Sequence, residues 1–193
     1  MTYFIVVAVA MAVLAIIIYN GLVRARLRVR EGWSAVDVQL QRRTSLIPNL
    51  VETVKGYAAY ERDTITRVVQ SRAALTSAEG PREAAAANAE LTAALGTLFA
   101  LSEAYPDLKA NQSYLLLQHD LRDTENKIAF ARNYYNGAVE EYNTRVQSVP
   151  GVLVARPFRF DAAEFFTADE AARAVVEVDV RTTSEPPSRN PAR

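Results

Sequence analysis

The 193-residue chain carries 22 basic and 22 acidic residues, half of its residues are apolar, and it contains no cysteine. A chain of this size can bury the core of one domain. The missing cysteines exclude disulfides, thiolate zinc sites and cysteine nucleophiles. Four arginines precede every acidic residue, which leaves 18 basic against 22 acidic residues from Glu31 onward. This mildly acidic body makes nucleic acid an unsuitable partner, because nucleic-acid binding needs concentrated positive charge.

Residues 1–23 contain no charged side chain and predict a transmembrane helix, because about 20 apolar residues span the hydrocarbon core. A buried core helix is the alternative, but such helices are seldom uncharged for so long. In a cleaved signal peptide the positive charge precedes the apolar segment, whereas here it follows. By the positive-inside rule, the N-terminus faces out and the remainder lies in the cytoplasm. We therefore expect a single-pass protein of a bacterial inner membrane, flanked on its cytoplasmic side by Arg24, Arg26, Arg28 and Arg30.

Apolar residues spaced mostly three and four apart predict one helix over residues 24–79. Pro48 lies inside it, and because Leu46 and Ile47 are poor N-caps, we expect a kink at the proline rather than two helices. Gly80 suits the C′ position that closes this helix, and Pro81 suits the first turn of the next.

Two more helices follow. Residues 81–105 have apolar side chains in 4-3-4-3-4 spacing on an alanine-rich background, and the chain turns at Pro106. Asn111 is the expected N-cap of a third helix that runs to about Ser148. Its apolar seam consists of Tyr114, Leu117, Leu121, Thr124, Ile128, Ala131, Tyr135, Ala138 and Tyr142. Short connections between long helices predict antiparallel packing in a bundle.

After Pro150 the aromatic residues of segment 150–166 are expected to pack back on the bundle, with a short helix near 162–166. Residues 168–174 could add one or two helical turns, and 175–180 alternate like a strand but have no strand partner. The predicted fold class is therefore all-α: a transmembrane helix (1–23) continuing into a long antiparallel cytoplasmic bundle (24–180), a short C-terminal helix, and a disordered tail (181–193) rich in Ser, Pro and Arg.

The sequence offers little for catalysis. His119 is the only histidine, and it is expected on a polar helix surface; no serine sits in a nucleophile-elbow context. The Glu-x-x-His pattern of di-iron bundles and the glycine motifs of nucleotide-binding sites do not occur. We therefore expect no enzyme, no metal and no cofactor.

Polar residues near the helix seams form the candidate interaction set: Arg42, Arg43, Asn49, Glu52, Lys55, Glu125, Asn126, Arg132, Tyr135 and Asn136. They could form a buried network that fixes the register between helices. They could equally line a groove for a partner or ligand, and amphipathic tyrosines suit either arrangement.

Several motifs give the chain a family likeness. These are YN at 19–20, WSAVDVQLQRRTSLIPNLVETVKGYAAYE at 33–61, YPDLKAN at 105–111, TENKI at 124–128, YYNGAVEEYN at 134–143, and an aromatic segment before VDV at 178–180. In this order they resemble the LemA family of membrane-anchored bacterial proteins. The resemblance implies a helical bundle with a long first helix and a mostly cytoplasmic single-pass protein. It implies no established enzyme activity and no catalytic residues.

Two functions are compatible with these observations. The first is a membrane-tethered scaffold or protein-interaction module that forms homo-oligomers, since alanine-rich and heptad-spaced faces favour self-association. The second is a regulatory or sensory subunit that binds another membrane protein or a small ligand through a polar, tyrosine-rich groove. Burial of the candidate polar residues would favour the first function, and an open cleft the second.

Overall fold

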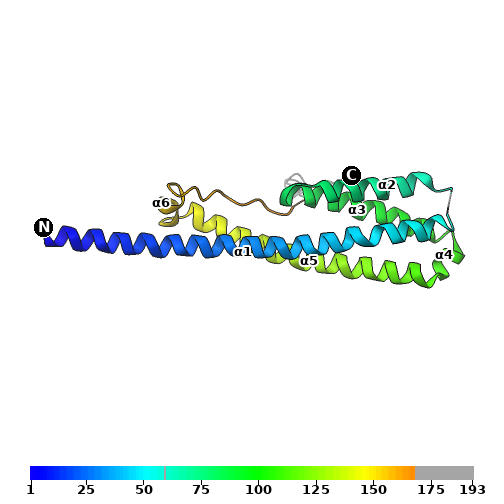
Figure 1. Ribbon diagram of the computed structural model, residues 1–193, viewed down its shortest axis with the longest axis horizontal. Helices are drawn as coiled ribbons and strands as arrows, with labels where there is room; N and C mark the ends of the chain where they lie inside the picture. The colour runs from blue at the N-terminus through cyan, green and yellow to red at the C-terminus, as the bar shows by residue number, and fades with distance from the viewer. Residues whose placement is uncertain (59, 168–193) are drawn as a thin grey trace, which may run out of the picture.

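A computed structural model of the chain describes residues 1–58 and 60–167. Within these residues the secondary structure is entirely helical, as the sequence predicts. The helices are α1 (Thr2–Lys55), α2 (Arg62–Ser77), α3 (Gly80–Ser102), α4 (Pro106–Ala110), α5 (Gln112–Gln147) and α6 (Gly151–Ala155). Figure 1 shows α1 and α5 side by side along the molecule, with the α2–α3 hairpin packed on the half of α1 far from the N-terminus.

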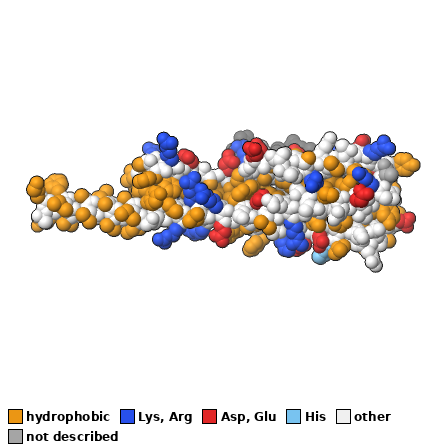
Figure 2. Space-filling model, in the orientation of Figure 1, with side chains coloured by type: hydrophobic (Ala, Val, Ile, Leu, Met, Phe, Trp, Pro, Cys, Tyr) orange, Lys and Arg blue, Asp and Glu red, His pale blue; other side chains and the backbone are white. Residues whose placement is uncertain are grey.

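The first helix is 54 residues long, about 81 Å at about 1.5 Å per residue. Its apolar N-terminal part projects beyond the bundle (Figures 1 and 2), and its most apolar 18-residue window is 0% buried. From Leu22 onward the same helix contributes to the core. The candidate membrane anchor is thus continuous with the first helix of the bundle, as expected from the sequence.

The prediction of one helix over residues 24–79 is wrong at its C-terminal half. The helix runs through Pro48, whose side chain faces outward, but it ends at Lys55. The chain then reverses direction, and α2, which begins at Arg62, returns along α1 (Figure 1). The turn follows Gly56, which has the lowest helix propensity of any residue except proline.

The α2–α3 connection also differs in detail from the prediction. The last helical residue of α2 is Ser77, and its C-cap is Ala78, which has an extended backbone. Gly80 therefore does not occupy the C′ position predicted for it. Gly80 has a φ of +84°, a left-handed conformation that favours glycine, and it opens α3. Pro81 occupies the first turn of α3, as predicted. By length and composition α3 could also cross a membrane, but 44% of that window is buried and it serves as a core helix.

The start and end of the third predicted helix are confirmed. Pro106 begins the short helix α4, and the Asn111 side chain accepts a hydrogen bond from the Tyr114 backbone N–H at 3.0 Å. The resulting helix, α5, ends at Gln147. Most of its predicted apolar seam is buried, including Tyr114, Leu121, Thr124, Ile128, Ala131, Tyr135 and Tyr142.

The segment after α5 packs back on the bundle, but without the predicted helix at 162–166. A helix forms earlier, at α6, and residues 160–167 are irregular and return along the bundle (Figure 1). Their backbone groups bind side chains of α5, so helical hydrogen bonds are not needed to satisfy them. Phe160 and Phe166 are buried, which confirms that aromatic residues of this segment join the core. The features predicted for 168–174, 175–180 and the tail from 181 lie outside the described residues.

Candidate functional site

The seam between α1 and α5 holds a buried cation. The Arg43 side chain is 3% exposed, and its Nη1 lies 2.6 Å from Oε2 of Glu125 on α5. The same nitrogen donates a hydrogen bond of 2.5 Å to Oδ1 of the buried Asn88 on α3. Burial lowers the pKa of Arg43, and the nearby Glu125 carboxylate partly opposes this shift. One guanidinium therefore joins three helices of the bundle.

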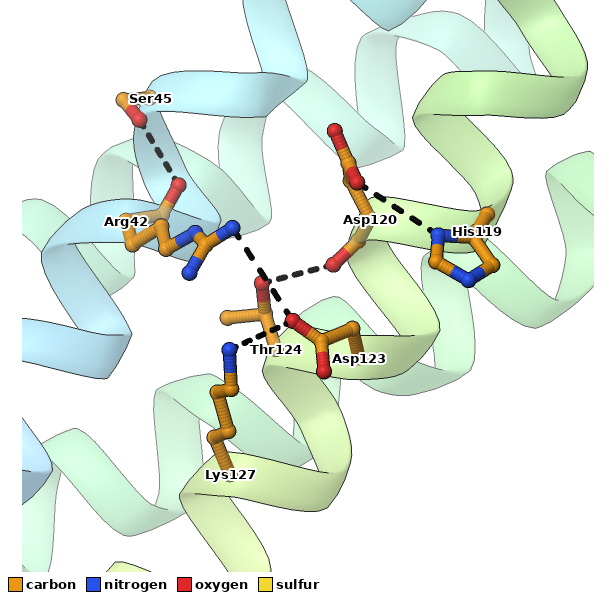
Figure 3. A network of polar contacts seen from close by, with 7 residues as sticks. All are labelled: Arg42, Ser45, His119, Asp120, Asp123, Thr124 and Lys127. Carbon is orange, nitrogen blue, oxygen red and sulfur yellow. Dashed lines mark hydrogen bonds and ion pairs between the residues drawn. The ribbon is translucent and has the colours of Figure 1, made fainter.

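A second polar cluster lies on the surface of the same seam (Figure 3). Asp123 accepts a contact of 2.8 Å from Lys127 and faces Arg42 across 4.0 Å. The hydrogen bond from Lys127 is the main cause that holds the pKa of Asp123 below its usual value. Beside them, Nδ1 of His119 lies 3.6 Å from Asp120, and the His119 side chain is 78% exposed. This histidine is on the helix surface, as predicted.

Two Tyr-Asn pairs on α5 bind the segment 161–166. Asn136 donates to the Phe166 carbonyl and accepts from its N–H at 3.3 and 2.9 Å. Asn143 does the same with Ala163, at 2.9 and 2.8 Å. Because the asparagines lie seven residues apart, two helical turns place them on one face. We call this set of asparagines and their neighbouring tyrosines the Tyr-Asn clamp.

The tyrosines of the Tyr-Asn clamp complete it. The Tyr135 hydroxyl donates to the Glu164 carbonyl at 2.6 Å, and the Tyr142 hydroxyl donates to the Asp161 carbonyl at 2.9 Å. Both rings are buried, and desolvation raises the pKa of Tyr135 to about 12 and raises that of Tyr142. The sequence interpretation missed Asn143, although the repeat of Tyr-Asn at a spacing of seven was visible in YYNGAVEEYN.

Trp33 on α1 closes the space beneath the Tyr-Asn clamp. Its ring centroid lies 5.7 Å from that of Tyr135 and 6.2 Å from that of Phe166. Next to it, a Cβ atom on Gly32 would lie 3.0 Å from the Tyr135 Cα, so α1 and α5 approach closely here. The WSAV and YYNG motifs are thus brought together as one packed contact.

An open groove lies on the outer side of the seam, with a volume of about 370 Å³. Its lining residues are Ala35, Gln39, Asn126, Lys127, Phe130, Ala131 and Tyr134, and we call it the seam groove. Phe130 is 79% exposed and Tyr134 is 47% exposed. These two rings lie four residues apart on α5 and expose aromatic surface together, and contiguous exposed apolar surface marks contact sites, so this groove is a candidate contact surface.

The predicted polar residues therefore divide into distinct environments. Arg43 and Glu125 form the ion pair, Tyr135 and Asn136 belong to the Tyr-Asn clamp, and Asn126 lines the seam groove. Arg42 joins the surface cluster. The expected single network does not include the exposed residues Asn49, Glu52, Lys55 and Arg132. Lys55 lines a separate pocket between the ends of α1 and α2.

No described part of the chain, 1–58 or 60–167, groups three His, Asp or Glu side chains that could hold a metal. In these residues, buried polar side chains bond across the bundle, as those of Arg43, Tyr135 and Tyr142 do, or within their own helix, as Thr124 does to the Asp120 carbonyl. The geometry of the site is that of a packed helical framework with an open groove along its α1–α5 seam.

Several known proteins are similar to this chain in sequence. Protein LemA of Metamycoplasma hominis is 24% identical over 161 residues, covering 83% of this chain and 73% of that protein. Magnetosome protein MamQ 2 of Paramagnetospirillum magneticum is 25% identical, and magnetosome protein MamQ of Magnetospirillum gryphiswaldense is 27% identical, each over 174 residues. The alignments cover 77% of this chain but only 64% of each MamQ protein. A family model described as LemA family matches residues 32–180, and the chain belongs to the LemA family.

Proposed function

We propose that this chain is a membrane-tethered helical scaffold whose bundle binds proteins, further copies of itself included, and catalyses no reaction. The observation that supports this most directly is α1, which is 0% buried over its apolar window and forms the core with α5 beyond it. A tether continuous with a packed bundle fixes the position and orientation of the bundle relative to the bilayer. The names of the relatives, LemA and MamQ, describe no enzyme.

The proposed topology places the bundle in the cytoplasm of a bacterial cell, attached to the inner membrane. Arg24, Arg26 and Arg30 are exposed at the bundle end of the apolar segment, where the positive-inside rule expects cytoplasm. The chain has no cysteine, so a single Tyr60→Cys variant reports topology cleanly. We expect a membrane-impermeant maleimide to label Tyr60→Cys only after the cells are opened. Labelling in intact spheroplasts would place the bundle outside.

The surface we propose for self-association is the seam groove. It runs beside α1 and α5, which continue the direction of the tether, so it faces sideways toward neighbouring copies held in the same orientation. Phe130 is the most exposed aromatic side chain of that groove, at 79%. Burial of one such ring in an interface is worth about 1.5–3 kcal/mol, enough to act as a central contact.

Cross-linking of the full chain in native membranes, at several expression levels, tests this proposal. We expect defined oligomers for the natural chain and their loss in Phe130→Glu. Leu116→Glu is the matched control, because Leu116 is also on α5 and 62% exposed but does not line the groove. Monomer at every expression level, or equal loss in both variants, would refute self-association through this groove.

A second candidate function is a regulatory subunit that binds a small ligand or another membrane protein in the same groove. The observation favouring it is the pairing of polar Asn126 and Lys127 with exposed aromatic rings, a combination typical of ligand sites. Asn126→Leu separates the two functions. It is expected to leave oligomers intact and to abolish binding of a polar ligand or partner recovered with the natural chain.

A further inference from the structure

The bundle end nearest the apolar segment carries exposed apolar side chains around α6. Val149, Leu153 and Phe158 are 78%, 70% and 61% exposed. The opposite face of α6 is fixed, because α6 packs on both α1 and α5 and its Val154 and Ala155 are buried. A rigidly held element with one apolar face in solvent indicates a docking surface.

The aromatic end of this surface lies beside the uncharged part of α1. The rings of Phe158 and Tyr19 are in edge contact, with centroids 5.0 Å apart, and Phe158 lines one groove with Ala15, Ile16 and Tyr19. Ile16 precedes the first arginine, Arg24, by eight residues, or about 12 Å along a helix.

The length of the uncharged segment fixes what that position means in a bilayer. Residues 1–23 form a helix of about 34 Å, and the hydrocarbon core takes about 30 Å of it. The edge of the core nearest the arginines then falls between residues 20 and 23, so Ile16 lies about 6–10 Å inside it. Phe158, packed beside Ile16, brings its ring to a similar depth, while the backbone of its irregular segment must stay near the interface, where it can be hydrated.

The charge of this surface matches anionic lipid. Residues 149–160 contain Arg156 and Arg159, both exposed, and no acidic residue. Arg24 and Arg145 line a second groove with Pro150 and Gly151, directly beside the apolar segment. Arginine side chains at such a boundary reach the phosphates while their stems stay on apolar surface. A second copy of this chain is a poorer occupant, because two basic surfaces repel.

We propose that residues 149–160 form a second membrane contact, which inserts Val149, Leu153 and Phe158 at the acyl boundary and holds anionic lipid headgroups with Arg156 and Arg159. The inference rests on α1 spanning the membrane. It adds an interfacial element to that anchor, so that the bundle touches the bilayer at two places and is held in one rotational setting.

Depth-dependent fluorescence quenching tests the contact. The full chain, free of natural cysteine, is given one cysteine by Leu153→Cys, labelled with an environment-sensitive dye, and reconstituted in vesicles with 30% phosphatidylglycerol and lipid-borne quenchers. Val9→Cys in the apolar segment serves as the inserted control, and Tyr60→Cys, at the opposite end of the bundle and 97% exposed, serves as the solvent control.

We expect the dye at position 153 to emit at shorter wavelength than at position 60 and to be quenched most by shallow quenchers. In vesicles of phosphatidylcholine alone, or with Arg156→Gln and Arg159→Gln together, this quenching should decrease. Quenching at position 9 but not at 153 would overturn the second contact while leaving the anchor intact. A blue shift at 153 without lipid quenching would mean a protein partner and would also overturn it. Absence of quenching at position 9 would overturn the membrane anchor itself.

Discussion

The Arg43–Glu125 ion pair predicts an unequal response to removing its two members. The Arg43 side chain is 3% exposed, whereas that of Glu125 is 42% exposed. Replacing Glu125 by Leu leaves a buried guanidinium without its counter-charge; breaking a fully buried pair costs about 3–5 kcal/mol, and the partial exposure of Glu125 places this loss near the lower end. Replacing Arg43 by Met keeps an apolar stem and leaves a carboxylate that water can reach.

The smaller loss of stability expected for Arg43→Met comes mainly from Asn88. In Arg43→Met the buried Asn88 Oδ1 loses its hydrogen-bond donor, which costs about 1–3 kcal/mol. We therefore expect Glu125→Leu to destabilise the bundle by roughly 1 kcal/mol more than Arg43→Met. The double variant should lie close to Arg43→Met alone, because no unpaired charge remains in it.

Guanidinium unfolding of the full chain in detergent micelles measures these differences. Trp33, the only tryptophan, packs on Tyr135 and Phe166 and reports the tertiary structure by fluorescence, while circular dichroism follows helix content. An Arg43→Met loss equal to or larger than the Glu125→Leu loss would refute the assignment of Arg43 as the desolvated member of the pair.

Three further predictions concern the end of the bundle that carries the Tyr-Asn clamp. Asn143→Ala removes two hydrogen bonds to Ala163, so hydrogen exchange of the Ala163 amide should accelerate by roughly tenfold for each 1.4 kcal/mol lost. The Phe166 amide, which Asn136 binds, should stay protected. Equal acceleration at both amides would contradict independent binding by the two asparagines. Folding raises the Tyr135 pKa to about 12, so the stabilisation that this hydroxyl gives the folded state is complete below pH 10 and is lost as the pH rises toward 12, by up to about 1.4 kcal/mol per pH unit. The melting temperatures of the natural chain and of Tyr135→Phe should therefore converge between about pH 9 and 11.5. Gly151→Ala should destabilise the folded chain by about 1–3 kcal/mol, because a Cβ atom there would lie 1.9 Å from the Arg145 carbonyl oxygen. Gly137→Ala, which has free space around its Cβ, should stabilise the folded chain by about 0.5–1 kcal/mol. Comparable melting temperatures for the two variants would count against the close packing at Gly151.

The helices could be predicted from apolar spacing, and the missed turn shows the limit of that signal. Val54, Ala58 and Ile65 are all buried, and their separations of four and seven residues suit one continuous helix. They belong instead to α1, the turn and α2, which pack on one core from opposite directions. The spacing of apolar residues shows which face of a helix is buried. Two antiparallel helices that bury their faces in the same core can continue one another's spacing, so the spacing does not reveal the turn between them. Only Gly56 marked the reversal, without an accompanying proline.

The sequence identified many of the polar residues of the candidate site, but it could not tell which of them are buried and which are exposed. Arg42 and Arg43 are neighbours of the same type, yet one is exposed and the other is buried. A helix turns by about 100° between adjacent residues, so a small error in the phase of the seam exchanges their environments. The Tyr-Asn clamp was harder to predict because its acceptors are backbone carbonyls of residues 161–166, and backbone groups leave no trace in the side-chain pattern.

On the proposed membrane placement, the single long helix α1 would make the bundle a lever on the bilayer. From Arg24 to Lys55 the helix extends about 48 Å beyond the uncharged segment, and Pro48, near its far end, is the one residue of this stretch that cannot donate a backbone hydrogen bond. A spanning helix adjusts its tilt to the thickness of the membrane around it. A change of about 10° in tilt therefore sweeps the far end of α1 sideways by about 8 Å. On that placement, membrane thickness would set the position of the far end of α1 at Lys55, and a protein bound there would be displaced with it.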